Sequence, residues 1–309
     1  MASYSIIIPV KEEEKSLPIL YKEILTTFRT ISGHFEIIFV DDGSTDKSVE
    51  VIKLLKKRDK RIEIIEFRGN FGKSLALNAG MQKARYATTI LLDADLQDNP
   101  KEIPKLIKKL GEGFDLVTGW RKKRNDPISK KISSFLFNQG TIFISGIKLH
   151  DFNCGLKAMD TKVAKLLNLH GELHRFIPIL AAKQKYKVAE VQVVHRLRKY
   201  GSSKFGFERS WRGVLDLLTI VFITDYSLKP AHFFGRIGLL FLLVGIFMDG
   251  YVTFLKITTG STQDRIPLLL AGILFILLGV QLLSTGLIAE MISHYFARNE
   301  RDTTSKLIK

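Results

Sequence analysis

The chain has 309 residues, a length that predicts about two structural units at the usual ~150 residues per domain. Its 47 Lys and Arg exceed its 31 Asp and Glu, and the net charge of +16 predicts an anionic partner: nucleic acid, membrane lipid or a phosphorylated substrate. The single cysteine, Cys154, excludes an intrachain disulfide and a cysteine-rich zinc site, and the 46% of hydrophobic residues excludes a wholly disordered chain.

The N-terminal part of the chain alternates between short apolar runs and helical stretches. The runs SIIIPV, FEIIFVDD, RIEIIEF, TTILLDAD and DLVTGW are near-continuous and rich in β-branched residues, which is typical of strands covered on both faces. Helical patterns lie between them at 16–30, 45–58, 73–84 and 100–111. This alternation predicts an α/β fold with a doubly wound, mostly parallel sheet, whose ligands bind at the carboxyl ends of the strands.

Acidic residues follow several of these strands. The first strand is followed by KEE, the second ends in DDGSTD at 41–46, and the fourth ends in DADLQD at 93–98. The sequence has neither the glycine motif of a dinucleotide site nor that of a phosphate-binding P-loop. An Asp-x-Asp pair at a strand end is a weak signal alone, but together with the upstream acids it predicts hard oxygen ligands for a divalent cation that holds a diphosphate.

Two stretches with helical apolar spacing follow, near residues 127–147 and 205–226. An apolar stripe of this kind usually faces a protein core. Here the basic flanking residues and the nearby apolar segments favour amphipathic helices that lie on the membrane interface.

Two apolar segments near the C-terminus are long enough to cross a bilayer. Residues 266–289 are 24 positions without a charge, and residues 237–255 contain Asp249 as their one charged residue. A helix of this length crosses a hydrocarbon core of ~30 Å. The segments predict transmembrane spans at about 235–256 and 266–289, in preference to two buried helices of a soluble core. Asp249 is expected to face a partner helix or the headgroups.

Flanking charge predicts the orientation of this hairpin. Residues 196–236 carry eight Lys and Arg, the connector between the spans carries two, and the tail carries four. The positive-inside rule then places both chain ends in the cytoplasm. We expect a cytosolic domain over 1–230, a transmembrane hairpin over 231–290 and a basic cytoplasmic tail over 291–309. Gly272, Gly279 and Gly286 lie near one helix face, which is compatible with a homo-oligomer packed through the second span.

The motifs together resemble a known family. IIIPVKEEE, FVDDGSTDKS, NFGKSLALNAGM and LLDADLQDNPKEIP resemble family 2 glycosyltransferases with the GT-A fold. The later motifs HDFNCGLKAMD, ELHRFIPILAA and VVHRLRKYGSSKFGFER, with the terminal hairpin, resemble polyisoprenyl-phosphate glycosyltransferases, of which bactoprenol glucosyltransferases are the nearer and dolichyl-phosphate mannose synthases the more distant. The resemblance implies inverting transfer of one sugar from a nucleotide sugar, with UDP-glucose favoured over GDP-mannose and a modified arabinose donor, to a polyprenyl phosphate at a bacterial inner membrane.

The same resemblance implies roles for particular residues. The implied nucleotide-sugar site comprises Pro9, Glu13, Val40, Asp41, Asp42, Lys73, Asp93, Ala94, Asp95, Arg121, Arg198 and Lys204. The implied ligands of Mg²⁺ or Mn²⁺ are Asp95 and Gln97, with Asp93 beside them and turned toward the ribose or sugar. The implied acceptor-phosphate site comprises Arg121, Arg124, Arg175, Arg198, Ser203 and Lys204.

Asp93, Asp95 and Asp151 are the implied catalytic acids. Asp151 resembles the acid that such enzymes place near the acceptor, as a general base or as an orienting group. A base is needed less than usual, because a phosphate monoester with a second pKa of ~6 is already largely ionised at neutral pH. Lys73 either lies near the sugar nucleotide or is a solvated residue at the start of a helix.

Three other functions remain to be weighed against this one. A processive polysaccharide synthase is expected to carry QxxRW and more spans, which this sequence lacks. A membrane-anchored, non-catalytic binding subunit would not need the complete set of motif acids. Nucleic-acid binding would account for the charge, but the basic excess lies beside the apolar spans and no recognition motif is present, so anionic lipid is the expected partner.

Overall fold

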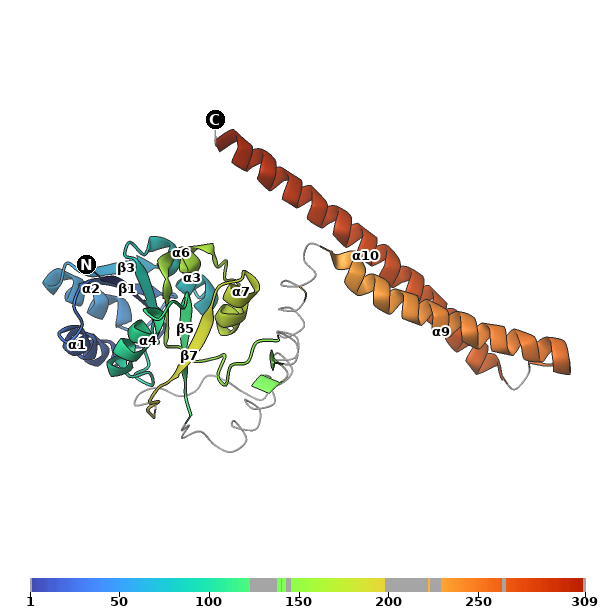
Figure 1. The fold of residues 1–309 in the computed structure, drawn as a ribbon, viewed down its shortest axis with the longest axis horizontal. Helices are drawn as coiled ribbons and strands as arrows, with labels where there is room; N and C mark the ends of the chain where they lie inside the picture. Colours follow the sequence, from blue (N-terminus) through green and yellow to red (C-terminus); the bar gives the residue numbers. More distant parts are fainter. Residues whose placement is uncertain are drawn as a thin grey trace. The chain divides into compact units, whose positions relative to one another are not determined.

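The computed structural model divides into two compact units, Met1–Ile220 and Val221–Lys309 (Figure 1). The structure describes residues 2–122, 138–139, 141–142, 146–197, 222, 229–262 and 265–307, the last without the side chains from 296 onward. Each unit is treated separately below. The predicted amphipathic helices near 127–147 and 205–226 fall almost entirely outside the described residues.

The N-terminal unit is built on a seven-stranded sheet with the order β3-β2-β1-β4-β6-β5-β7. The strands are β1 Ser3–Val10, β2 His34–Asp41, β3 Ile62–Glu66, β4 Thr88–Leu91, β5 Leu116–Trp120, β6 Lys157–Asp160 and β7 Val188–Gln192. Four strand pairings are parallel, and β6 runs antiparallel to β4 and β5 on either side of it. The prediction of a mostly parallel sheet is therefore confirmed, and β6 and β7 are strands that the pattern did not indicate.

Helices cover both faces of this sheet. They are α1 Leu17–Phe28, α2 Ser48–Arg58, α3 Lys73–Lys83, η1 Pro100–Glu102, α4 Ile103–Leu110, α6 Thr161–Leu166, η2 Leu173–Phe176 and α7 Ile177–Lys183. The predicted helical stretches match α1, α2, α3 and the continuous pair η1 and α4. Asn99 caps η1 by accepting a hydrogen bond from the Lys101 backbone, and Pro100 occupies the first helical position, where its missing N–H costs nothing.

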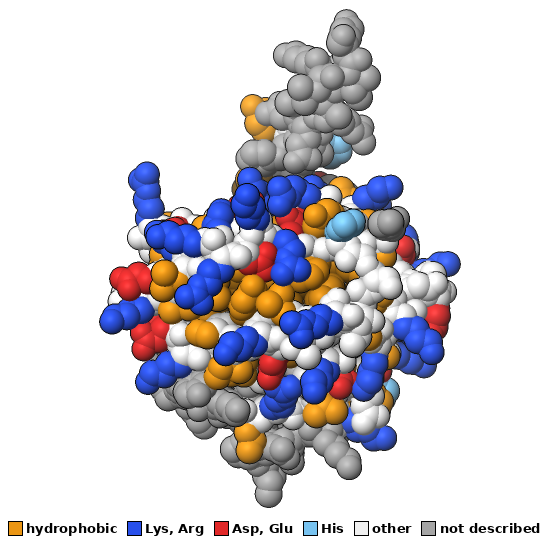
Figure 2. Space-filling model, turned by 90° about the vertical axis from the view of Figure 1, so that its left-hand side faces the viewer, with side chains coloured by type: hydrophobic (Ala, Val, Ile, Leu, Met, Phe, Trp, Pro, Cys, Tyr) orange, Lys and Arg blue, Asp and Glu red, His pale blue; other side chains and the backbone are white. Residues whose placement is uncertain are grey.

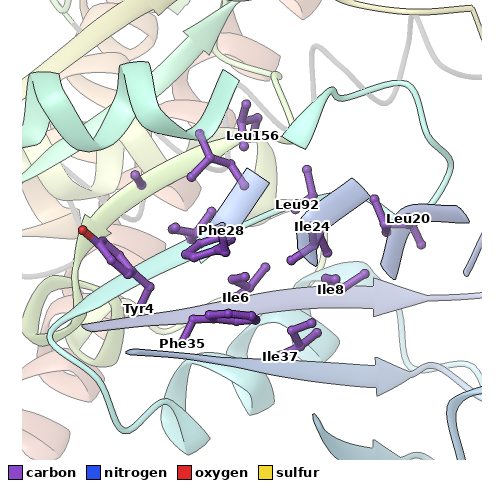
Figure 3. Packing of buried hydrophobic residues seen from close by; sticks show 14 of the residues in the cluster. Tyr4, Ile6, Ile8, Leu20, Ile24, Phe28, Phe35, Ile37, Leu92 and Leu156 are labelled. Carbon is purple, nitrogen blue, oxygen red and sulfur yellow. The ribbon is translucent and has the colours of Figure 1, made fainter. Parts of the chain in front are cut away.

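Alternate residues of β1 fill two separate layers of core. Ile6 and Ile8 point to the face covered by Leu20 and Ile24 of α1, where Phe28 packs on Phe35 of β2 with ring centroids 4.5 Å apart (Figure 3). On the opposite face, α3 approaches so closely that a Cβ on Gly80 would lie 2.4 Å from the Ile7 side chain. This contact holds α3, and the residues at its N-terminus, against the centre of the sheet.

The second unit consists of two long helices, α9 Pro230–Thr259 and α10 Ile266–Leu307. An 18-residue window within Pro230–Thr259 has a mean hydropathy of 2.0, and one within Ile266–Tyr295 has a mean hydropathy of 2.6, so both helices are long and apolar enough to cross a membrane. Helix α10 runs well past residue 289, so the predicted tail continues the second helix as far as Leu307.

Small residues bring the two helices together. A Cβ on Gly279 would lie 2.7 Å from the Gly238 carbonyl oxygen, and one on Gly245 would lie 2.6 Å from that of Gly272. The Asp249 carboxylate lies where a side chain at Gly272 would be, so this acid faces the partner helix as expected. These glycines pack within the hairpin of one chain, and the suggestion that they pack between subunits is therefore not needed to explain them.

The surface of the N-terminal unit carries many basic side chains. On the face that Figure 2 shows, Lys and Arg are spread among Asp and Glu and are not gathered in one patch. Such an arrangement is typical of a solvated surface. The net positive charge therefore does not indicate a basic patch on this face that would bind an anionic partner.

Candidate active site

The nucleotide-site residues predicted on the first two strands lie side by side. Pro9 and Val40 are register partners in β1 and β2, and Asp41 is the last residue of β2. Asp41 accepts a hydrogen bond from the Ser44 backbone at 2.9 Å through Oδ2, whereas its buried Oδ1 has no partner in the described part of the chain. Glu13 is buried beside this edge and accepts a hydrogen bond from the Ser16 hydroxyl at 2.6 Å. An unpartnered buried acceptor is costly unless a ligand donates to it.

Asp42 organises the loop that leads into α3. Its carboxylate accepts hydrogen bonds from the backbone N–H of Phe71 at 2.7 Å and of Gly72 at 3.0 Å. Gly72 has φ 93°, a left-handed conformation that favours glycine, and α3 begins at the next residue. Asp42 thus fixes the position of Lys73 at the start of α3.

Lys73 forms an ion pair with the first acid of the DAD motif. Its Nζ lies 2.6 Å from Asp93 Oδ1 and 2.7 Å from Oδ2, so it contacts both carboxylate oxygens. Burial alone lowers the pKa of Lys73, but the adjacent Asp93 outweighs it and the net pKa is raised. Burial likewise acts to raise the pKa of Asp93, and Lys73 reverses this and lowers it. Both groups are therefore charged at neutral pH, and Lys73 is not a freely solvated helix start.

Asp95 and Gln97 lie on a tight turn after β4. Asp95 Oδ1 accepts a hydrogen bond from the Gln97 backbone at 3.1 Å, and Leu96 between them has φ 63°. The described residues contain no cluster of three or more His, Cys, Asp or Glu placed to hold a metal. Mg²⁺ or Mn²⁺ does not require such a cage when substrate phosphates supply the remaining oxygens, and the hard oxygens of Asp95 and Gln97 fit that kind of site.

Arg121 and Asp151 form the second ion pair of the site. Arg121 Nε lies 2.6 Å from Asp151 Oδ2 and its Nη2 lies 2.9 Å from Oδ1, in the bidentate geometry that guanidinium groups favour. The Asn153 backbone also donates to Oδ1, at 3.1 Å. Burial acts to lower the pKa of Arg121, but its hydrogen bonds to Asp151 raise it overall. Both oxygens of Asp151 are therefore already held by N–H donors.

The other predicted residues divide into two groups. Ala94 is buried, and Arg175 is also buried and pairs with Glu172 at 2.7 Å. Arg124, Arg198, Ser203 and Lys204 lie outside the described residues, so their roles remain predictions.

Three residues near these pairs were not predicted from the sequence. Gly155 lies against two acids, because a Cβ there would be 2.5 Å from the carboxylate oxygens of both Asp93 and Asp98. Lys157 is a buried lysine on β6, and His174 shares a 3.0 Å hydrogen bond with Ser74. Gly155 and Lys157 belong to the motif HDFNCGLK, in which the residue types point to Asp151 alone as a site residue.

Comparison with known proteins identifies the family. The model of the family described as glycosyl transferase family 2 matches residues 5–167. The chain belongs to this family. It is 35% identical over 301 residues to the dodecaprenyl-phosphate galacturonate synthase of Rhizobium johnstonii, covering 96% of this chain and 89% of that one. It is 34% identical over 295 residues to the undecaprenyl-phosphate 4-deoxy-4-formamido-L-arabinose transferase of Pectobacterium carotovorum subsp. carotovorum, covering 94% and 88%.

Solved structures show the same fold for this family 2 glycosyltransferase. Glucosyl-3-phosphoglycerate synthase from Mycobacterium tuberculosis, in complex with Mn²⁺, UDP-glucose and phosphoglyceric acid, aligns with a TM-score of 0.56 at 18% identity, covering 74% of this chain and 82% of that one. Mannosyl-3-phosphoglycerate synthase from Rubrobacter xylanophilus aligns with a TM-score of 0.57 at 16% identity, covering 72% and 74%. The predicted GT-A fold and the predicted glycosyltransferase family are therefore confirmed.

Proposed function

We propose that this enzyme transfers a single sugar from a nucleotide sugar to a membrane polyprenyl phosphate, with inversion at the anomeric carbon. The observation that carries the proposal is the pair of ion pairs at one end of the sheet, Lys73–Asp93 and Arg121–Asp151, in a chain that also has two membrane-length helices. The curated relatives named above are both polyprenyl-phosphate enzymes that match almost the whole chain, which supports the same acceptor class here.

The nucleotide would bind at the edge formed by β1 and β2. Asp41 Oδ1 is a buried acceptor without a partner in the described part of the chain, and a base N–H such as that of uracil would supply the missing donor. Pro9, Glu13, Val40 and Asp42 surround this position in sequence or register. UDP is the favoured nucleotide because a solved structure of the same fold holds UDP-glucose.

A divalent cation would lie between the diphosphate and the turn after β4. Asp95 and Gln97 would hold it, and the Mn²⁺ in the solved structure of the same fold supports a metal of this class. When bound, such an ion neutralises the charge that develops on the leaving diphosphate. Asp93 would instead contact the donor sugar, because both of its oxygens are already bound by Lys73.

The acceptor phosphate attacks with an oxygen that is already ionised, so no strong base is required. Asp151 would orient Arg121, and that guanidinium would stabilise phosphate charge near the anomeric carbon. We assign Arg124, Arg175, Arg198, Ser203 and Lys204 to the binding of the acceptor phosphate. The hairpin would hold the domain on the cytoplasmic side of a bacterial inner membrane, where anionic lipid attracts its basic flanks.

The donor sugar differs between the relatives, whose names give galacturonate and a formamido-arabinose. UDP-glucose, which the family resemblance favours, is the reference donor, and GDP-mannose and a modified arabinose donor are the alternatives. The test is transfer of radiolabel from a set of nucleotide sugars to undecaprenyl phosphate by the full-length protein, with and without EDTA. Asp95→Ala should abolish transfer. Glu112→Ala, at an exposed acid that pairs with Lys109, is the matched control and should retain it.

Failure of the wild-type protein with every nucleotide sugar would leave the non-catalytic binding subunit as the better hypothesis. Transfer that survives both EDTA and Asp95→Ala would contradict the metal assignment. A polymeric product would instead indicate a processive synthase.

A further inference from the structure

A buried lysine beside the active site has no task in the mechanism above. Lys157 lies on β6, between β4 and β5, and is 3% exposed. Within the described part of the chain its ammonium donates to the Cys154 carbonyl oxygen and forms no ion pair with a carboxylate. An ammonium has three donors, and burying one without an anion is costly. The position is therefore arranged for a group that arrives with the substrate.

Lys157 lies at the inner end of a recess that opens beside the Lys73–Asp93 pair. Polar side chains that line this recess include Lys73, Asp93, Asn153, Lys157 and His174. The side chains of Lys73 and Asp93 are 35% and 28% exposed, whereas Lys157 is almost completely buried. A sugar ring held at the Lys73–Asp93 pair would thus extend a substituent inward toward Lys157.

Two acids near Lys157 are each paired with another cation. Asp93 is bound by Lys73 through both oxygens, and Asp151 is bound by Arg121 in the same way. Asp98 has His195 Nδ1 3.6 Å from its Oδ1.

The remaining basic side chain of the recess does not compete with Lys157 for an anion. Burial, reinforced by Lys73 and Arg175, holds the pKa of His174 well below its usual value, so its imidazole is neutral. Burial also lowers the pKa of Lys157, and an anion bound there would offset this effect.

We propose that this recess receives the carboxylate of a nucleotide-linked uronic acid and that Lys157 is the residue that recognises it. The inference rests on the sugar transfer proposed above and narrows its donor. A carboxylate on the sugar's C5 brings a negative charge and two acceptor oxygens to the buried ammonium. The hydroxymethyl group of glucose brings an acceptor but no charge, so it leaves the buried ammonium uncompensated. UDP-glucose is then the poorer donor, which departs from the expectation from the sequence.

The test compares pairs of donors that differ only in the substituent on C5, which is a hydroxymethyl group in the hexose and a carboxylate in the uronate. Full-length protein in detergent is assayed for transfer to undecaprenyl phosphate from UDP-glucose, UDP-glucuronate, UDP-galactose and UDP-galacturonate. In at least one pair, kcat/KM for the uronate should exceed kcat/KM for the hexose by about 100-fold. A site with a buried polar group rejects an analogue that cannot pair with that group by a factor of this order. Lys157→Gln should remove most of that preference, because both donors then meet a neutral amide.

Two controls separate recognition from folding. Lys162→Gln alters an exposed lysine on the next helix and should keep the preference of the wild type. UDP alone carries no sugar, so its effect on the thermal unfolding temperature should be the same for Lys157→Gln and wild type. If Lys157→Gln does not respond to UDP, Lys157→Met, which keeps the length of the side chain without its charge, replaces it in the donor comparison.

The outcomes distinguish this inference from the function on which it rests. Equal use of hexose and uronate, better use of the hexose, or use of GDP-mannose alone would overturn the inference and leave sugar transfer intact. A preference that survives in a folded Lys157→Gln would overturn the role of Lys157. No transfer from any nucleotide sugar would overturn the proposed function and the inference together.

Discussion

The Arg121–Asp151 ion pair is the most buried charge pair of the site, and removing one partner has a large predicted effect. The two side chains are 10% and 4% exposed and share hydrogen bonds of 2.6 and 2.9 Å. Asp151→Leu leaves a guanidinium buried without its anion, which should lower the free energy of unfolding of the N-terminal unit by about 3–5 kcal/mol. Arg121→Met should have a similar cost for the converse reason. The double variant Arg121→Met/Asp151→Leu replaces the pair with apolar groups and should recover most of the loss.

The assay measures stability and activity in parallel. Urea unfolding of the detergent-solubilised protein, followed by tryptophan fluorescence, gives the unfolding free energies of the four proteins of this double-mutant cycle. Transfer of radiolabelled sugar should be lost in all three variants, including the double variant that regains stability. Single variants that lose less than about 1 kcal/mol would refute the argument from burial. If Asp151→Asn were stable and its pH–rate profile lost the acidic limb of the wild type, Asp151 would be a general base and not an orienting group.

Three further predictions test other parts of the molecule. Gly155→Ala places a methyl group 2.5 Å from the carboxylates of Asp93 and Asp98. The free energy of unfolding in urea should therefore fall by about 1–3 kcal/mol, and kcat should fall as well. Unchanged values would show that the loop moves to accept the methyl group. His174 takes up a proton on unfolding near its usual pKa but not while folded, so below about pH 6.5 the free energy of unfolding should fall as the pH falls, by up to about 1.4 kcal/mol per unit. His174→Gln should remove that part of the slope between about pH 5 and 7, and an unaltered slope would contradict the assignment. Gly279→Leu should force the two long helices apart and lower the thermal stability of the hairpin in detergent, whereas Gly250→Leu, at a position where a Cβ would have no neighbouring atom within 4 Å, should not.

Hydrophobic periodicity predicts the strands β1 to β5 but neither β6 nor β7. β1 and β2 are eight-residue strands with nearly continuous burial, so their pattern is unambiguous. β6 has four residues, KAMD, and becomes a strand because β4 and β5 pair with it on either side. The helix before β7, α7, has only seven residues, which is too short to give a clear helical period. The alternation of helix and strand that would indicate β7 is therefore not visible in the sequence. Long-range pairing of this kind leaves no local signal in the sequence.

The site shows the same division between local and long-range information. The DAD motif and the acids after β2 are visible as residue types at strand ends, and the fold does bring them to one edge of the sheet. The ion-pair partners of the acidic residues cannot be read from the sequence, because they are distant along the chain. Lys73 precedes Asp93 by 20 residues, and Arg121 precedes Asp151 by 30. The burial of Lys157 could not be predicted from the sequence, because a lysine in a short strand with polar residues is usually exposed to solvent.

The pairing of each acid decides its chemistry, although the residue types are the same. A carboxylate whose two oxygens face an ammonium or a guanidinium is a poor ligand for a divalent cation, because the protein cation repels the metal and occupies its lone pairs. We therefore expect Lys73 to direct Asp93 toward neutral partners such as sugar hydroxyls, and Arg121 to do the same for Asp151 at the proposed acceptor side. Asp95 differs in position, since Leu96 at φ 63° turns the backbone so that Gln97 donates to it from the next residue but one. On this reasoning we expect a metal to associate with Asp95 and Gln97, the donor sugar with Asp93, and the phosphate of the acceptor with Arg121.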